Sequence, residues 1–547
     1  MVQRSIWMVV LLLLSAAGIA TASDGLPAHR GVSWSAPGDV NEAADALLAM
    51  RAKGVTAIYT TVIEDDRLFT LADSLGIAFY QQVPISRAAA PSVKDQVAAL
   101  LHDGLSSIIE RSRRHDSARY LGLAFNVDTG DRRTCEALAD LAEQLRAEDV
   151  DGMRLFYTTV LTDSDRCGAL VDFVLLDARA TSASRRLSAW HSAHQVPAAV
   201  MAGAPRPPLQ DKTKAEETQA YRLDDELDQV RQHVTEAVFV HTWSGVDAIS
   251  PFDEPRIDRR GISYALTNEG ATPALEVLQG YFTEDQTVFA FAPPRADREV
   301  IPAWFVIAVW VLVALLGALY ASVLPFRQLV ARYFFTPRFF RDSVQEGREL
   351  GVDVYLPAAL LLSSAAGLLG AGLLLYVGPS YATTVVVGWL PEGVRPWVEA
   401  AVQEPWLLAI TVALGALLCA FFWAAVIAIL SRQSAGPRLG QALTLVVWPR
   451  WPVFLLLVMA AVLLTLSSPL ALWTGVVVVS LWTLGWPLRT ARTLRHVLKM
   501  QVPASRKPLL MYLLSPFVPM LVAAVLLLIY RAELRFIWRL LQDAPGL

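Results

Sequence analysis

Residues 30–62, RGVSWSAPGDVNEAADALLAMRAKGVTAIYTTV, contain a complete strand–helix–strand unit and decide the fold of the N-terminal half of the chain. The runs 30–35 and 56–62 are apolar and β-branched, which is typical of buried strands. Between them, Ala44 and Leu47 recur at helical spacing, and Gly54 is placed to end the helix. A buried strand that is followed by an amphipathic helix predicts one unit of a parallel sheet covered by helices.

The same alternation continues to residue 245. Further strand-like runs occupy 77–85, 120–127, 153–161, 172–178, 197–203 and 237–245. Helical patterns between them occupy 65–75, 92–114, 134–147, 165–170, 181–194 and 215–234. Eight such units in about 220 residues match an α/β fold of the (β/α)8 TIM-barrel type in number and size. A doubly wound open sheet is the alternative, but no Gly-x-Gly-x-x-Gly turn follows the first strand to support it.

In a barrel of this kind, functional side chains lie at the C-terminal ends of the strands. The acidic candidates for catalysis at that end are Glu64, Asp128, Asp177 and Asp247. The candidates for substrate binding are polar or aromatic, so they can hydrogen-bond to a ligand or stack on it, and they are Trp34, Tyr59, Gln81, Asn126, His241 and Trp243. Packing of the rings inside the barrel is the alternative interpretation. The spacing of Cys and His residues predicts no metal site, and we expect no cofactor.

The remaining segments indicate an exported protein of the membrane. Residues 1–22 combine a positive Arg4, an apolar run and Ala20-Thr21-Ala22, which predicts a signal peptide, with an uncleaved anchor as the alternative. We expect an extracytoplasmic barrel and then an all-α polytopic membrane domain of about five helices beyond its first span. The expected boundaries are 24–283 for the barrel, 284–301 for a linker, 302–324 for the first transmembrane helix, 325–350 for a cytoplasmic interfacial segment and 351–547 for the multi-span domain.

Charge placement predicts the orientation. The segments 325–350, 431–450 and 489–508 are rich in arginine, whereas 378–404 carries mainly glutamates, so the former should face the cytoplasm. We therefore expect a multi-pass protein of the bacterial inner membrane with a periplasmic barrel and the lipid bilayer as a partner. The tail conflicts with this rule, because its arginines would lie outside, and we expect an amphipathic interfacial helix there. A net charge of −4 argues against a nucleic-acid partner.

Three cysteines occur in the chain. Cys419 lies within an apolar run, whereas Cys135 and Cys167 lie in the exported part, where an oxidising compartment permits a disulfide. From the sequence we interpret the latter two as free thiols, with a disulfide as the alternative.

Residues 28–283 contain several motifs in a fixed order. They begin with a Gly-Val strand, a helix with Met and Gly, and a helix with Phe, Asp and Gly. The positions are Gly31, Met50, Gly54, Phe69, Asp73, Gly76 and Ile77. The motifs end with His241-Thr242-Trp243-Ser244 in the eighth strand and the closing segment from Arg260-Gly261-Ile262 through Thr272-Pro273-Ala274 to Leu278. In this order and spacing the segment resembles the catalytic barrel of glycoside hydrolase family 2, the β-galactosidase and β-glucuronidase group. The resemblance implies a TIM barrel and O-glycosyl hydrolysis by two glutamates.

Both glutamates that the resemblance implies are missing. The acid/base residue should follow the Asn at the end of strand four, but Val127 follows Asn126. The nucleophile should end strand seven, but no carboxylate occurs between Pro197 and Gln210. Valine neither donates nor accepts a proton, so we expect a pseudoenzyme that binds a glycan or an envelope protein. An active hydrolase that uses relocated carboxylates is the alternative, and whether the chain is an enzyme stays open.

The membrane part carries little information about function. Its spans, together with the interfacial segment, are weakly similar in topology to the five-span Yip1-like group. Ionisable residues are nearly absent from the spans, which favours an anchor over a transporter. A component of envelope transport or assembly with a periplasmic accessory barrel is the second alternative.

Overall fold

The computed structural model describes residues 26–243 apart from 86–89, 104, 149, 180 and 207–211, then 265–266, 272–291 apart from 287, and 302–336. It further describes 351–377, 393–430, 439–448 and 530–542, with a few isolated positions. Two compact units emerge from these residues, and segment 535–545 groups with the N-terminal one. The predicted signal peptide and Asp247 lie outside the described residues.

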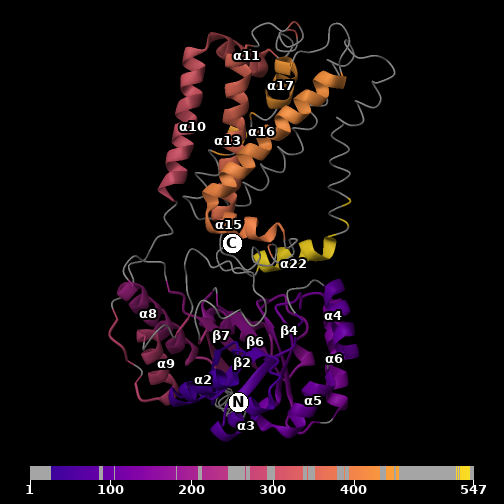
Figure 1. The fold of residues 1–547 in the computed structure, drawn as a ribbon, viewed down its shortest axis with the longest axis vertical. Coiled ribbons are helices and arrows are strands. Elements are labelled where there is room, and N and C mark those ends of the chain that lie inside the picture. The colour runs from indigo at the N-terminus through magenta and orange to yellow at the C-terminus, as the bar shows by residue number, and fades with distance from the viewer. Residues whose placement is uncertain are drawn as a thin grey trace, which may run out of the picture. The chain divides into compact units, whose positions relative to one another are not determined.

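The N-terminal unit is a closed barrel of eight parallel strands in sequential order (Figure 1). The strands are β1 (His29–Ser33), β2 (Ala57–Thr61), β3 (Ala78–Gln82), β4 (Tyr120–Phe125), β5 (Arg154–Thr159), β6 (Phe173–Ala178), β7 (Ala198–Gly203) and β8 (Ala237–His241). The register of β1 with β8 closes the sheet, with Gly31 opposite Phe239. The prediction of an eight-stranded parallel barrel is therefore confirmed, and the open sheet is excluded.

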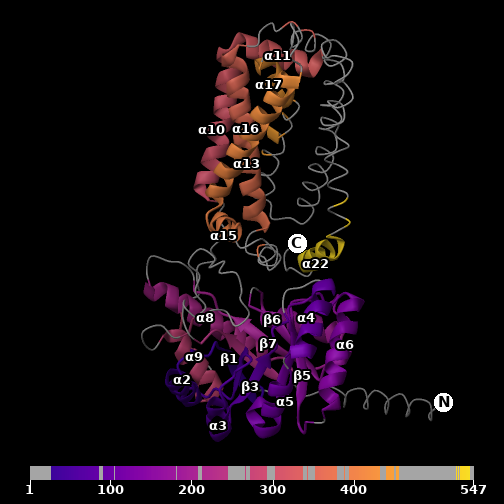
Figure 2. The same cartoon turned by 45° about the vertical axis from the view of Figure 1, so that its right-hand side comes forward.

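Helices surround the barrel (Figure 2). They are α2 (Val40–Ala52), α3 (Asp66–Leu75), α4 (Ala90–Asp103), α5 (Leu105–Arg114), α6 (Arg132–Ala147), α7 (Ala183–Ala193), α8 (Lys212–Val230) and α9 (Pro273–Thr283). Helices α2, α3 and α6 begin after Asp39, Asp65 and Asp131, whose carboxylates accept a hydrogen bond from the backbone N–H two residues on. An aspartate in this position satisfies an N–H that has no partner within the helix, and so fixes where the helix starts.

The connection from β5 to β6 differs from the prediction. We expected a helix over 165–170, but the segment forms only a 3-10 turn at Gly168–Leu170. The Asp165 carboxylate accepts hydrogen bonds from the backbone N–H groups of Cys167 and Gly168, at 3.0 and 3.2 Å. Such local bonds offer the backbone an alternative to helical pairing.

The same connection contains a disulfide, which corrects the interpretation of two free thiols. Cys135 on α6 and Cys167 are bonded, with their Cα atoms 5.1 Å apart. Their sequence separation of 32 gave no indication of this proximity. The bond joins the segment after β4 to the segment after β5.

The barrel has two apolar layers. One lies between strands and helices and includes Val32, Ile58 and Leu138. The other fills the barrel interior with large rings and small alanines, namely Ala57, Tyr59, Tyr80, Phe125, Phe156, Phe173, Leu175, Ala199, Met201, Ala237 and Phe239. Gly31 is required by this filling, because a Cβ there would lie 2.6 Å from the Phe239 ring.

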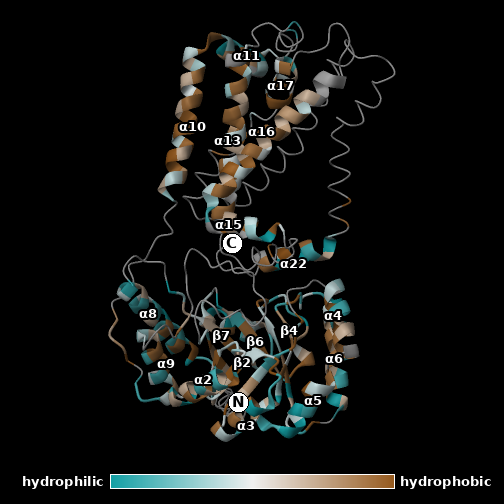
Figure 3. Ribbon diagram, in the orientation of Figure 1, coloured by the Kyte–Doolittle hydropathy of each residue, from teal (hydrophilic) through white to brown (hydrophobic). Residues whose placement is uncertain are grey.

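The second unit is helical and, over the helices long enough to span, strongly apolar (Figure 3). Its described helices are α10 (Ala303–Ser322), α11 (Leu324–Phe335), α13 (Val352–Val377), α15 (Arg395–Gln403), α16 (Pro405–Leu430) and α17 (Leu439–Val447). Among the described residues, α10, α13 and α16 contain stretches that are long and apolar enough to cross a membrane. Three further apolar runs of the sequence, 444–467, 469–488 and 509–530, complete the five helices expected over 351–547, and they lie wholly or largely outside the described residues.

Helices α13 and α16 approach closely through small residues. A Cβ at Gly367 would lie 2.1 Å from the carbonyl oxygen of Ala409 and 2.9 Å from Cβ of Ala413. Close approach at small residues is the usual way in which helices associate where water supplies no hydrophobic driving force. The pairing is therefore compatible with a membrane environment.

Candidate binding site at the barrel mouth

A layer of polar side chains follows the aromatic filling at the C-terminal ends of the strands. Strand residues alternate between the two faces of a sheet, so the residue two positions beyond an interior residue also points inward. Applied to the interior residues of β1, β3, β5, β6 and β8, this rule yields Ser33, Gln82, Thr158, Asp177 and His241. All but His241 are buried, and His241 is partly buried. This layer forms the floor of the candidate site, which we call the barrel mouth.

Asp177 is the central charge of the mouth. Arg179 donates two parallel hydrogen bonds to it, Nε to Oδ1 at 2.9 Å and Nη2 to Oδ2 at 2.7 Å. The amide Nδ2 of Asn126 donates a further bond to Oδ2 at 2.7 Å. The Arg179 guanidinium and these hydrogen bonds outweigh the effect of burial and hold the pKa of Asp177 far below its ordinary value. The carboxylate therefore stays ionised and has no proton to donate.

Asn126 is held in an unusual backbone conformation beside Asp177. Its φ of 50° lies in the left-handed region, which asparagine tolerates better than most residues. Its N–H donates to the carbonyl oxygen of Thr158 at 2.8 Å. The side-chain oxygen Oδ1 is buried and finds no hydrogen-bond partner among the described residues. A buried acceptor in this state is costly unless a donor reaches it.

His241 and Ser33 form a second polar pair at the mouth. The Nδ1 atom of His241 lies 2.6 Å from Oγ of Ser33. Burial, and then the nearby Arg179 charge, lower the pKa of His241 to about 3. The imidazole is therefore neutral at physiological pH, so it has one donor and one acceptor nitrogen.

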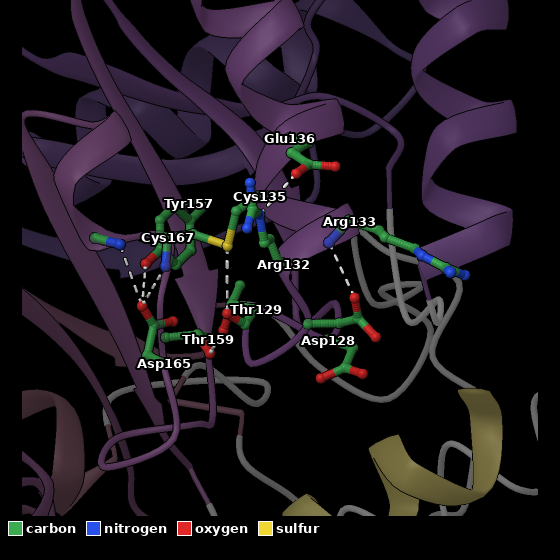
Figure 4. The surroundings of a disulfide bond; sticks show 12 residues. Asp128, Thr129, Arg132, Arg133, Cys135, Glu136, Tyr157, Thr159, Asp165 and Cys167 are labelled. Carbon is green, nitrogen blue, oxygen red and sulfur yellow. Dashed lines mark hydrogen bonds and ion pairs between the residues drawn. A yellow bond between two sulfur atoms is a disulfide. The ribbon is translucent and has the colours of Figure 1, made fainter. Parts of the chain in front are cut away.

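The segment after β4 lies beside the disulfide (Figure 4). Asp128 is 1% exposed and pairs with Arg539, while burial raises the pKa of its carboxyl. Tyr157 donates to the buried Asp165 at 2.7 Å. The loops after β4 and β5 are joined by the disulfide and by the N–H of Arg166, which donates to the carbonyl oxygen of Thr129 at 3.0 Å.

The remaining candidates are distributed over different environments. Glu64 is exposed. The side-chain oxygen of Gln81 accepts a hydrogen bond from the N–H of Ile63. Both tryptophans, Trp34 and Trp243, are buried in the layer between strands and helices. Tyr59 lies in the barrel interior, where its hydroxyl is 2.9 Å from Oγ1 of Thr158.

Our sequence reasoning missed Ser33 and Thr158, which alternation along the strand locates only once one interior residue of that strand is known. Each lies two residues beyond an interior position, Gly31 and Phe156 respectively. The described residues contain no group of three or more His, Cys, Asp or Glu side chains that could hold a metal.

The end of β7 presents no side chain to the mouth. Its last residue is Gly203, and a Cβ there would lie 2.4 Å from the carbonyl oxygen of Arg179. The backbone of Arg179 thus fills the space that a side chain on β7 would need.

Comparison with known proteins gives only distant similarities. No family model and no curated protein matches the chain. Solved structures with similarity include a GH2 β-galacturonidase from Eisenbergiella tayi, with 15% identity over 48% of this chain and 52% of that one and a TM-score of 0.38. A β-glucuronidase from Ruminococcus gnavus has 13% identity over 47% and 51%, with a TM-score of 0.41. The chain spans about half the length of these proteins, and the assignment of the barrel rests on its own strand pairing.

Proposed function

We propose that the barrel unit binds a hydroxyl-rich ligand, such as the end of a glycan, at its mouth without cleaving a glycosidic bond. The observation that carries this proposal is the state of Asp177. Both of its oxygens accept hydrogen bonds from Arg179, and one also accepts from Asn126. A carboxylate engaged in this way is a fixed part of the site wall rather than a nucleophile or an acid.

Glycosidic hydrolysis in the usual form requires two carboxyl groups, about 5–5.5 Å apart for retention and about 6.5–9.5 Å apart for inversion. The position after Asn126 is Val127, which is buried in the layer between strands and helices. The inward position of β7 is Gly203, which has no room for a side chain. Asp128 is paired with Arg539, and Glu64 is exposed. These placements support binding over catalysis by relocated carboxylates.

The polar groups of the mouth suit a neutral ligand with hydroxyl groups. Oδ1 of Asn126 is an acceptor in need of a donor, and a sugar hydroxyl supplies one. The neutral His241 adds both a donor and an acceptor. An anionic ligand would face the ionised Asp177, although Arg179 balances that charge locally.

The proposed location is the outer face of a bacterial inner membrane, with a glycan or an envelope protein as the partner. The disulfide supports an oxidising compartment for the barrel, since such bonds are rare in the cytosol. The apolar helices α10, α13 and α16 support a membrane anchor. A role in envelope assembly shares these features and differs only in the partner.

The test uses the full chain in detergent micelles on an array of glycans, with Asn126→Ala and Gln144→Ala compared. Both variants remove a carboxamide, but Gln144 lies exposed on α6, away from the polar layer. We expect retention of at least one glycan class by the unchanged protein and by Gln144→Ala, and its loss in Asn126→Ala.

Two results would contradict the proposal. Equal retention by both variants would remove the mouth as the binding site. Turnover of aryl glycosides that disappears in Asp177→Asn would show that the chain is a hydrolase, because the substitution keeps the shape of the side chain and removes its charge.

A further inference from the structure

The last described helix, α22 (Arg531–Gln542), contributes a side chain to the barrel unit. Nη1 of Arg539 donates to Oδ1 of Asp128, and the two residues are 411 positions apart in the sequence. The side chain of Asp128 is 1% exposed and that of Arg539 is 22% exposed. This is a buried carboxylate that receives a guanidinium from the far end of the chain.

The loops after β4 and β5 form a seat for Arg539. Gly130 makes room for it, because a Cβ at that position would lie 2.9 Å from Cδ of Arg539 and 3.0 Å from the carbonyl oxygen of Ser164. The disulfide fixes this seat, since both of its sulfurs lie within 3.6 Å of the carbonyl oxygen of Thr129. The seat is therefore a rigid feature of the barrel.

The helix presents one face to this contact. Phe536 and Leu540 are buried and lie four residues apart, with Arg539 beside them on the same face. Arg531 and Arg535 are exposed. Arg539 therefore borders the buried side of the helix, and it is the arginine that pairs with Asp128.

We propose that α22 is a latch that docks on the loop after β4, with Arg539 in the seat, and that the C-terminal tail therefore lies on the same side of the membrane as the barrel. This removes Arg539 from the conflict in the tail, while Arg531 and Arg535 remain exposed. The positive-inside rule describes arginines that remain free beside the membrane, whereas Arg539 is neutralised by a buried carboxylate of the exported domain. Because the same loop begins with Asn126, the latch also limits movement at the barrel mouth.

The first experiment measures the side of the tail in the full chain. Single cysteines are introduced in a Cys419→Ser background at three exposed positions, as Asp45→Cys on the barrel, Arg535→Cys on α22 and Arg327→Cys on α11. A membrane-impermeant maleimide is then added to spheroplasts. We expect labelling of the first two without permeabilisation and of the third only after it. Labelling of Arg535→Cys only after permeabilisation would overturn the proposal.

The second experiment measures the docking by hydrogen exchange of residues 126–131 in the full chain. Arg539→Gln removes the latch charge, and Arg535→Gln is the matched control on the same helix. We expect exchange of this loop to become about tenfold faster in Arg539→Gln and to stay unchanged in the control. Exchange of β2 should stay slow in both, which distinguishes undocking from unfolding.

A third variant tests whether the faster exchange comes from leaving Asp128 without its charged partner. Asp128→Asn combined with Arg539→Gln removes both charges, so the loop should recover part of its protection, because no buried carboxylate is left unpaired. Identical exchange in Arg539→Gln and Arg535→Gln would show that Arg539 does not hold the loop, and the latch would be wrong.

Discussion

Loss of the Cys135–Cys167 disulfide should destabilise the barrel substantially. The perturbation is the double substitution Cys135→Ser and Cys167→Ser. The bond closes a loop with a sequence separation of 32 residues. The loss of chain entropy for a loop of this length corresponds to about 4 kcal/mol at room temperature. For a domain of this size that amounts to a decrease in Tm on the order of 10 °C.

The assay is thermal unfolding of the full chain in detergent, followed by tryptophan fluorescence with and without a reductant. The matched control is Cys419→Ser, because Cys419 is a free, exposed cysteine on α16. We expect the control to unfold like the unchanged protein under oxidising conditions. Reductant should lower the Tm of both to the value of the double variant.

Two outcomes would refute this reasoning. A double variant that unfolds at the same temperature as the control would mean that the bond does not constrain the unfolded chain. A reductant that lowers the Tm of the double variant as well would mean that its effect does not act through this disulfide.

Three further predictions concern buried groups of the barrel. Gly203→Ala should lower the free energy of unfolding by about 1–3 kcal/mol, because the added methyl group meets the backbone of Arg179. Gly38→Ala is the control, because a methyl group there meets open space and should leave the free energy of unfolding unchanged. Denaturant titration measures both variants. Arg179→Met should lower the free energy of unfolding by about 3–5 kcal/mol, because the buried Asp177 loses the charge that pairs with it. The double variant with Asp177→Asn should recover part of this loss in the same titration. Burial raises the pKa of Glu226 from 4.5 to about 7 in the folded protein, so its contribution to stability decreases as pH rises between these values. Glu226→Gln should flatten that part of the measured pH profile, and an unchanged profile would contradict the assignment.

Much of the fold was predictable because its signals are local. Seven of the eight strands lie within the predicted apolar runs, and β1 begins one residue before its run, at His29. A strand that is buried on both faces must be continuously apolar in sequence, so the signal is local. The expected helix over 165–170 was wrong for an equally local reason. The carboxylate of Asp165 binds nearby backbone N–H groups, and this competition depends on the geometry of a few atoms rather than on hydropathy.

The mouth was only partly predictable. Asp177, Asn126 and His241 could be placed there, because the ends of parallel strands meet at one end of a barrel. Their protonation states, however, follow only from the three-dimensional structure. Arg179 makes Asp177 a fixed anion, and burial keeps His241 neutral, and neither effect follows from the order of residues.

By itself, the sequence determined that the chain has an eight-unit parallel barrel and a separate set of apolar helices, because both depend on hydrophobic patterns within single segments. Tertiary structure alone decided which cysteines pair, which face of each strand meets the mouth, and that Arg539 reaches Asp128 across 411 positions. Such contacts depend on how segments that are distant in the sequence pack against one another, and no pattern within a single segment encodes that packing.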